Sequence, residues 1–405
     1  MQRTVFLMNR NMRKRGAWSA LCIVLVLSVV ASCTPSRDFL LKRSAATRLD
    51  KQYVRVLLLN SGDRVTISSK KRIRISDVKT REVYYDGKGG NVHFYPERVK
   101  KPVVVESWES PLSVNGKPYR GLLELHNVVG RLHVINVVTM SEYLCGVVPS
   151  EISSSWNAEA LKAQAVAART FAWYHLINKK GSQVDFDATT SFQVYGGAAA
   201  ETDATNRAVA ATDGEIAVYR DNPILAYYHS TCGGHTIDNN YVWKGSGIPY
   251  LKGVRCDYCT ASPHFSWEEH LSLYDLRNYL GKKYTGVGAI TGVRFQRNRG
   301  RVVQVVITHK NGIIRLTGNE FRLLLPEKKI RSMCFTAAKT RDGLIVNGNG
   351  WGHGVGLCQW GANGMAARGL TYREILAHYY SGVRIVAMGN RALRHVNEKS
   401  IAARK

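Results

Sequence analysis

The chain has 405 residues, of which 45% are apolar and 21% charged, which is typical of a folded globular protein and not of a disordered or fibrous one. Its formal net charge of +27 indicates an anionic partner or surface. Nucleic acid, an anionic lipid surface and a carboxylate-bearing polymer all fit this charge, so other features must choose among them.

The N-terminus indicates export from the cytoplasm. Arg13, Lys14 and Arg15 precede an apolar run over residues 20–31, which is too short for a comfortable membrane span. The run ends in Val30-Ala31-Ser32-Cys33, which resembles the bacterial lipobox, so we expect a signal peptide over residues 1–33 and lipidation of Cys33. An ordinary cleaved signal peptide is the alternative. Both place the mature protein on the extracytoplasmic (periplasmic) side of the cell envelope, which argues against a nucleic-acid partner.

The first part of the exported chain reads as a tether followed by a β-rich subdomain. Residues 34–50 are polar and basic, which suits a tether between membrane and domain. A small β-rich subdomain is predicted over residues 51–112, because short apolar segments alternate there with Gly, Asn and Pro turns. The expected strands are residues 54–59, 65–75, 83–85, 92–95 and 103–105.

The most informative stretch covers residues 140–177. Strands over residues 122–126 and 132–138 lead into an apolar segment, residues 143–148, that Pro149 stops. Asn157 then caps an alanine-rich helix with Glu159 in its first turn. Glu151 is therefore predicted on the loop that enters this helix, beside apolar residues, where a carboxyl group can serve as a general acid. The alternative is a solvated charge near a helix start.

The rest of the chain mixes helices and strands, which predicts an α+β fold with a larger catalytic domain over residues 113–385 and a basic tail over 386–405. Helices are expected over residues 203–211, 271–280, 320–325, around 365–367 and over 372–380. Strands are expected over residues 216–219, 224–228, 292–296, 302–308 and 312–316.

Several motifs in this domain resemble one known family. They are VVPSE (147–151), ALKAQAVAART (160–170), the pair Gln193 and Tyr195, HSTCGGHT (229–236) and GWGHGVGLCQWGA (350–362). Together they resemble the stage II sporulation protein D / LytB family, whose catalytic members are peptidoglycan lytic transglycosylases. The resemblance places the acidic residue of these enzymes on Glu151. It also implies that Cys358 stands where many relatives carry Ser.

The resemblance also suggests which residues contact the substrate. The expected set is Arg169, Gln193, Tyr195, His229, Ser230, His353 and Gln359. We expect Arg169 to contact the substrate more than Glu151, because a guanidinium beside the acid would lower its pKa. For His353 the alternative is a buried histidine that ties the glycine turns together. Aromatic residues available to stack on sugars are Tyr195, Tyr227, Tyr228, Trp243 and Trp351, although core packing is the commoner role for such residues.

The cysteines leave two interpretations open. Cys232-x-x-His235 and Cys256-x-x-Cys259 are spaced as in zinc ribbons. Outside the cytoplasm a disulfide from Cys232 to Cys256 or Cys259 is the favoured prediction, and no metal or cofactor is expected. Some relatives hold zinc through Cys and His just before the Gln-x-Tyr element, but this chain has neither residue there.

The resemblance, with the lipobox-like Cys33, thus implies a lipid-anchored lytic transglycosylase. It would cleave peptidoglycan between N-acetylmuramic acid and N-acetylglucosamine with formation of 1,6-anhydromuramyl ends. The family prefers strands stripped of their stem peptides, which implies a cooperating amidase. The alternative is a non-catalytic wall-binding protein that enhances an amidase, as the LytB branch suggests.

Overall fold

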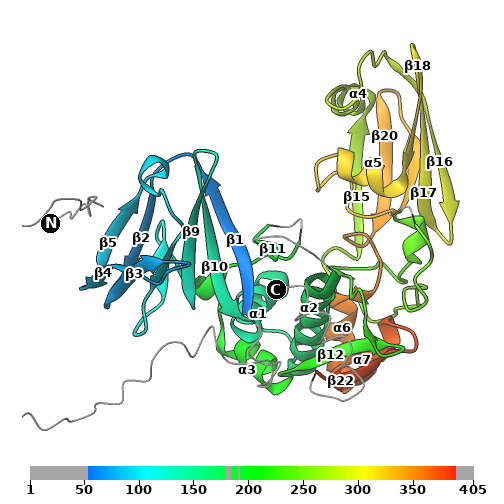
Figure 1. Cartoon of the computed structure of the whole chain (residues 1–405). Helices are drawn as coiled ribbons and strands as arrows, with labels where there is room; N and C mark the ends of the chain where they lie inside the picture. The colour runs from blue at the N-terminus through cyan, green and yellow to red at the C-terminus, as the bar shows by residue number, and fades with distance from the viewer. Residues whose placement is uncertain (1–52, 179–183, 190–191, 244, 389–405) are drawn as a thin grey trace, which may run out of the picture. The chain divides into compact units, whose positions relative to one another are not determined.

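The computed structural model describes residues 53–178, 184–189, 192–243 and 245–388. The predicted signal peptide, Cys33, the tether and most of the basic tail lie outside these residues. The chain forms two compact units, Met1–Val138 and Thr139–Lys405. Strands dominate the first and helices are mixed with strands in the second (Figure 1), so the predicted α+β class is confirmed. No helix among the described residues is both long and apolar enough to cross a membrane.

The first unit consists of two antiparallel sheets. One contains the strands β1-β10-β9-β6-β3-β4 in that order, and the other contains β5-β2-β7-β8. The strands are β1 (Tyr53–Ser61), β2 (Val65–Ser69), β3 (Ile73–Asp77), β4 (Val83–Gly87), β5 (Gly90–Phe94), β6 (Val103–Glu106), β7 (Leu112–Val114), β8 (Lys117–Tyr119), β9 (Leu122–Val128) and β10 (Arg131–Thr139). A short 3-10 helix, η3 (Pro96–Arg98), follows β5.

Two predictions for this unit need correction. The strand expected over residues 65–75 is two strands, because Ser69 Oγ accepts the Lys71 N–H at 3.1 Å and the chain turns there. The expected start of the second domain at Ser113 is also displaced. Ser113 lies in β7 and pairs with Ser68 of β2, so this segment completes the first unit, which ends at Val138.

The second unit contains the helices and the remaining strands. Its helices are α1 (Met140–Glu151), α2 (Ala158–Asn178), α3 (Asp203–Ala211), α4 (Leu273–Gly281), α5 (Gly318–Leu324), α6 (Gln359–Ala367) and α7 (Tyr372–Tyr379), with the 3-10 helices η4 (Gly197–Ala199) and η5 (Asn239–Tyr241). Its strands are β11 (Phe186–Asp187), β12 (Glu215–Tyr219), β13 (Asn222–Pro223), β14 (Tyr228–His229), β15 (Ser266–Ser272), β16 (Ile290–Asn298), β17 (Arg301–His309), β18 (Gly312–Thr317), β19 (Cys334–Lys339), β20 (Gly343–Asn349), β21 (Leu357–Cys358) and β22 (Arg384–Ala387).

Helix α2 is the centre of one core of this unit. Asn157 caps it as predicted, with Oδ1 accepting the Glu159 N–H at 3.0 Å. Its alanines let other elements approach closely, and α1, α3, α6, α7 and β12 all pack against it (Figure 1). The helix is buried along most of its length, so it holds the surrounding elements in fixed positions.

A second core lies between the sheets β15-β20-β19 and β16-β17-β18, with α4 and α5. The helix expected over residues 271–280 begins at Leu273, because Leu271 still belongs to β15. Strands β15, β19 and β20 were not predicted. In β15 the buried residues Trp267 and Leu271 are separated by charged ones, so the apolar signal is thin.

Candidate active site

Glu151 is the last residue of α1, not a residue of a loop. The helix begins at Met140 because Thr139 and Glu142 form a capping box: the Thr139 hydroxyl accepts the Glu142 N–H, and the Glu142 carboxylate accepts the Thr139 N–H. Pro149 is tolerated inside the last turn of this helix. The apolar run over residues 143–148, which was predicted as an extended segment, is therefore part of α1. Glu151 lies at the C-terminal end of this helix.

The Glu151 carboxyl group is held by two donors from other elements. Its Oε1 accepts the backbone N–H of Val194 at 3.2 Å, and the hydroxyl of Tyr228 is also hydrogen-bonded to the carboxyl. Burial raises the pKa of Glu151 above its usual value, and the two hydrogen bonds only partly oppose this effect. A carboxyl group that keeps its proton more readily than usual is suited to act as a general acid.

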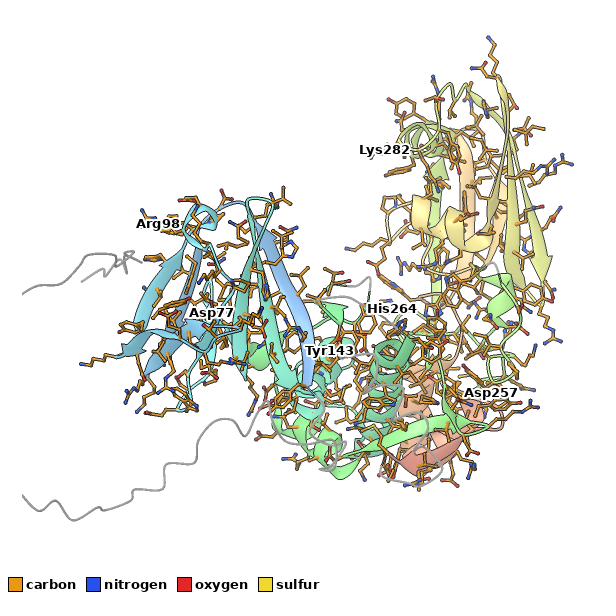
Figure 2. All side chains as sticks on the ribbon, viewed as in Figure 1. Asp77, Arg98, Tyr143, Asp257, His264 and Lys282 are labelled. Carbon is orange, nitrogen blue, oxygen red and sulfur yellow. The ribbon has the colours of Figure 1, made fainter. Side chains whose placement is uncertain are left out.

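Gln193 links the two donors. Its Nε2 donates to the hydroxyl oxygen of Tyr228 at 2.9 Å, and its Oε1 accepts the hydroxyl of Tyr143 at 3.2 Å. Gln193 and Tyr143 are almost completely buried, and Tyr143 lies in the interior of the second unit (Figure 2). The Tyr228 oxygen accepts the hydrogen bond from Gln193, so the Tyr228 hydroxyl proton is available to donate to Glu151. Gln193 is thus placed to position Tyr228.

Tyr195 is also buried and packs against Tyr143, with ring centroids 5.2 Å apart. It lies close to Gly146 of α1, where a Cβ would come within 2.6 Å of its ring. The Gln-x-Tyr element therefore anchors residues 193–195 on α1, which places the Val194 N–H next to Glu151. This placement does not suit sugar stacking by Tyr195.

Arg169, which was predicted to contact the substrate, is completely buried. Its Nη1 donates to the carbonyl of Glu215 and its Nη2 to the carbonyl of Val209, both at 3.1 Å. Burial lowers its pKa to about 10, and its carboxylate neighbours are Asp213 and Glu215 rather than Glu151. Arg169 holds the turn between α3 and β12 against α2.

Of the two histidines of the predicted site, His229 is buried and His353 is half-buried, and both are neutral at pH 7. His353 Nε2 donates to the Tyr228 carbonyl at 2.9 Å, and its Nδ1 accepts the Val355 N–H at 3.1 Å. Burial lowers its pKa to about 3. His229 Nδ1 lies 3.1 Å from the Val355 carbonyl, and burial holds its pKa well below the usual value. These contacts fit the alternative interpretation, in which His353 ties the glycine turns to the strand of Tyr228.

The remaining predicted residues lie around the same strand. Ser230 is half-buried, with Oγ 3.3 Å from the Thr231 hydroxyl, and its carbonyl accepts the Trp360 N–H at 3.0 Å. Gln359 is buried, and its Nε2 lies 3.5 Å from Gln164 Oε1. Tyr227 stacks on Trp243 at 4.5 Å, and Trp351 Nε1 donates to Glu327 at 2.8 Å. Trp156, just after Glu151 in the chain, packs edge-on against Trp360 at 4.9 Å, and both rings are half-buried.

The predicted disulfide is contradicted. Cys232 Sγ lies 3.6 Å from Cys259 Sγ, well beyond the roughly 2.05 Å of a disulfide. Cys232, Cys256 and Cys259 are all free thiols in the structure. His235 does not join them, because its Nε2 lies 2.8 Å from the Arg299 carbonyl.

The sequence analysis did not predict that Tyr228 and Val194 donate hydrogen bonds to Glu151. Tyr228 was considered only as a stacking residue, and a backbone N–H carries no sequence signal of its own. The aromatic-rich neighbourhood of Gln193 was the available clue, since a buried amide needs hydroxyl or backbone partners.

This chain is similar to known proteins over the region that contains Glu151. The stage II sporulation protein model matches residues 129–219, which include Glu151, Gln193 and Val194, and a domain of unknown function matches residues 256–356. An uncharacterized protein of Brachyspira hyodysenteriae is 38% identical over 71% of this chain and 77% of its own length. Stage II sporulation protein D of Bacillus subtilis is 35% identical over 61% of this chain and 74% of its own. The amidase enhancer of Bacillus subtilis is 30% identical over 60% of this chain and 40% of its own. The chain therefore belongs to the stage II sporulation protein D family.

Proposed function

We propose that the protein is a peptidoglycan lytic transglycosylase in which Glu151 is the catalytic acid and base. One observation carries the proposal: the Glu151 carboxyl is partly buried, has a raised pKa, and is held by the Val194 N–H and the Tyr228 hydroxyl. Family membership supplies the reaction class, and the geometry supplies a group with suitable properties.

The proposed reaction needs a single carboxyl group. Protonated Glu151 donates its proton to the oxygen that bridges N-acetylmuramic acid and N-acetylglucosamine, and the bond from muramic C1 to this oxygen breaks. Glu151, now a carboxylate, takes the proton of the muramic C6 hydroxyl as that oxygen bonds to C1. The product is a 1,6-anhydro ring, no water is consumed, and Glu151 regains its proton. Hydrolytic glycosidases, in contrast, require a second carboxylate.

Val194 and Tyr228 support the middle of this cycle. When Glu151 loses its proton, a negative charge develops in a buried place, which is costly without hydrogen-bond donors. Both donors are already in position, so the charge forms without rearrangement. The raised pKa favours the acid form before reaction, and the donors stabilise the carboxylate after it.

We further propose that the protein acts in the cell envelope, tethered by lipidated Cys33. The positive charge of the chain suits the lactyl carboxylates of peptide-free glycan strands. An amidase that removes the stem peptides would supply this substrate. Trp156 follows Glu151 closely in the chain, and its half-buried contact with Trp360 offers aromatic surface for sugar rings.

The decisive experiment compares Glu151→Gln with the parent protein on peptide-free glycan strands. Release of 1,6-anhydromuramyl products, measured by mass spectrometry, is expected to fall by about 10²–10⁴-fold because the proton needed in both steps is gone. Glu268→Gln is the matched control, since Glu268 is exposed on β15. The Glu151→Gln protein should unfold no earlier than the parent at neutral pH. When the pKa of a carboxyl group is raised by folding, the free energy of unfolding falls as the pH rises from the ordinary pKa to the raised one. A glutamine does not ionise, so the variant does not lose this stability.

The second candidate function is the stimulation of an amidase, because one relative is named an amidase enhancer. If neither the parent nor the variant forms anhydro products, while both bind glycan and stimulate an amidase equally, the enhancer function replaces the enzyme. If Glu151→Gln forms the products at the parent rate, Glu151 is not the catalytic residue.

A further inference from the structure

Four buried cysteines meet in the second unit. They are Cys232, Cys256, Cys259 and Cys358, and their sulfur atoms all lie within 4.8 Å of one another. All four side chains are completely buried. They come from three separate parts of the chain: the turn after β14, the loop before β15, and the end of β21. The convergence therefore depends on the tertiary fold and is not a consequence of local sequence spacing alone.

The spacing of the sulfur atoms is that of a metal site. A tetrahedral Zn²⁺ site with bonds of about 2.3 Å to sulfur has sulfur atoms about 3.8 Å apart. Cys232 Sγ and Cys259 Sγ are 3.6 Å apart, which matches an edge of this tetrahedron and is far longer than a disulfide bond. Four cysteine sulfurs at these distances are the donor set of structural zinc sites.

The surroundings supply hydrogen bonds suited to thiolates. Cys358 Sγ accepts the N–H of Cys232 at 3.2 Å and the N–H of Gly361 at 3.3 Å. The Gly234 N–H donates to Cys259, and the Tyr379 hydroxyl lies 3.0 Å from Cys256 Sγ. Such donors around a metal site stabilise the negative charge on its ligands. The cluster is closely packed, since a Cβ at Gly361 would come 2.7 Å from Cys256 Sγ.

We propose that Cys232, Cys256, Cys259 and Cys358 bind one Zn²⁺ ion as a tetrathiolate site. The proposal differs from the sequence-based expectation that the chain binds no metal, and it has Cys358 in place of the His235 of the sequence-based ribbon. Four thiolates cannot be buried together without a compensating positive charge. A bound Zn²⁺ supplies the missing positive charge and protects the thiols from oxidation outside the cytoplasm.

The site would hold the strand next to the catalytic group. β14 and β21 form a parallel pair in which Tyr228 faces Leu357 and His229 faces Cys358. Cys358 therefore links the ion to the strand that carries Tyr228, and Cys232 follows that strand directly. The ion does not touch the Glu151 site through any described contact, so its role is structural. The proposal stands whether or not the protein is an enzyme.

The test is the metal content of the full-length protein, produced without a polyhistidine tag, together with the Cys358→Ser variant. The Cys358 sulfur also caps α6 by accepting the Gly361 N–H, and a serine hydroxyl can do the same. Serine thus preserves the cap while removing a thiolate ligand. Cys334→Ser is the matched control, because Cys334 is a free cysteine outside the cluster.

Elemental analysis is expected to find equimolar zinc in the parent and in Cys334→Ser, and most of it lost from Cys358→Ser. Alkylation before and after chelation should show the four thiols protected only while zinc is bound. Two results would overturn the proposal: a parent protein without zinc whose intact mass shows disulfides among these cysteines, or iron in place of zinc with its visible absorption. The parent measurement decides the matter even if Cys358→Ser fails to fold.

Discussion

The backbone N–H of Val194 donates to the Glu151 carboxyl across 43 residues of chain, at 3.2 Å. This hydrogen bond joins the end of α1 to a short segment that has no regular secondary structure of its own. The segment is held in register by its neighbours Gln193 and Tyr195, which are buried against α1 and the Tyr228 strand. The position of the Glu151 carboxyl is therefore sensitive to packing at Gln193 and Tyr195.

Gly146→Ala should disturb this arrangement from inside α1. The new Cβ would come within 2.6 Å of the Tyr195 ring and 3.1 Å of Gly197 N, so the segment must move. We expect a loss of about 1–3 kcal/mol in the free energy of unfolding and slower release of anhydro products. Thermal unfolding and the product assay measure the two effects. Gly281→Ala is the control, since a Cβ there meets nothing within 4 Å, and equal behaviour of the two variants would contradict this account.

The sequence predicted the long helix α2, its Asn157 cap and α3 well, because alanine-rich and capping patterns are local signals. It misplaced Glu151 in a loop. Pro149 was taken to end an extended segment, but the structure places it inside the last turn of α1, where the helix forms although proline supplies no N–H to it. Strand 224–228 was predicted too long, since only Tyr228–His229 pairs, and with the distant β21.

Tertiary convergence is what the sequence could not supply. Arg169 was predicted to contact the substrate because a guanidinium beside Glu151 would lower the pKa of the acid. Nothing in the sequence indicated its actual partners. Its partners are carbonyls some 40 residues further along the chain, at Val209 and Glu215. Cys358 likewise stood apart from the other cysteines in sequence, so the fourth sulfur of the cluster was invisible until the fold placed it there.

Arg169→Met should therefore act on stability. It leaves two buried carbonyls without their donors, so we expect a loss of about 2–5 kcal/mol in the free energy of unfolding, measured with urea. Arg207→Met, at an exposed position of α3, is the control and should change little. Glycan affinity of the folded fraction should be unchanged. Weaker glycan binding with normal stability would restore the substrate role first predicted for Arg169.

The hydrogen bonds of Glu124, in the first unit, should make the free energy of unfolding depend on pH. Burial alone would raise its pKa, but hydrogen bonds from His126 at 2.9 Å and Arg55 at 2.7 and 2.6 Å outweigh burial and lower the pKa to about 2. A carboxyl group whose pKa is lowered by folding stabilises the folded protein at pH values above its ordinary pKa of 4.5. This stability is lost as pH falls through the native value.

The Glu124→Gln protein should be less stable than the parent by about 3 kcal/mol at neutral pH. The difference should shrink as the pH is lowered from about 4.5 towards 2. Urea unfolding at a series of pH values measures it, with the exposed Glu109→Gln as control. A difference that stays constant down to the lowest pH would show that Glu124 contributes packing and not charge.

Tyr228→Phe tests how Glu151 is tuned. The Tyr228 hydroxyl lowers the pKa of Glu151, so its removal should raise that pKa further. Because the reaction starts from protonated Glu151, the basic limb of the pH profile of kcat/KM should move to higher pH. The carboxylate formed in the first step also loses a donor, and hydrogen bonds to charged groups contribute about 1.5–3 kcal/mol, so the rate should fall roughly 10–100-fold.

The control is Tyr227→Phe, which changes the neighbouring tyrosine on the same segment and leaves the Glu151 contacts intact. Tyr228→Phe also deprives Gln193 Nε2 of its acceptor, so a modest loss of thermal stability is expected in this variant and not in the control. A merely structural role for Tyr228 would lower stability and rate but leave the basic limb where it is. A shifted limb is the result that only a hydrogen bond to the ionising carboxyl explains, because pKa follows the free-energy difference between its two protonation states.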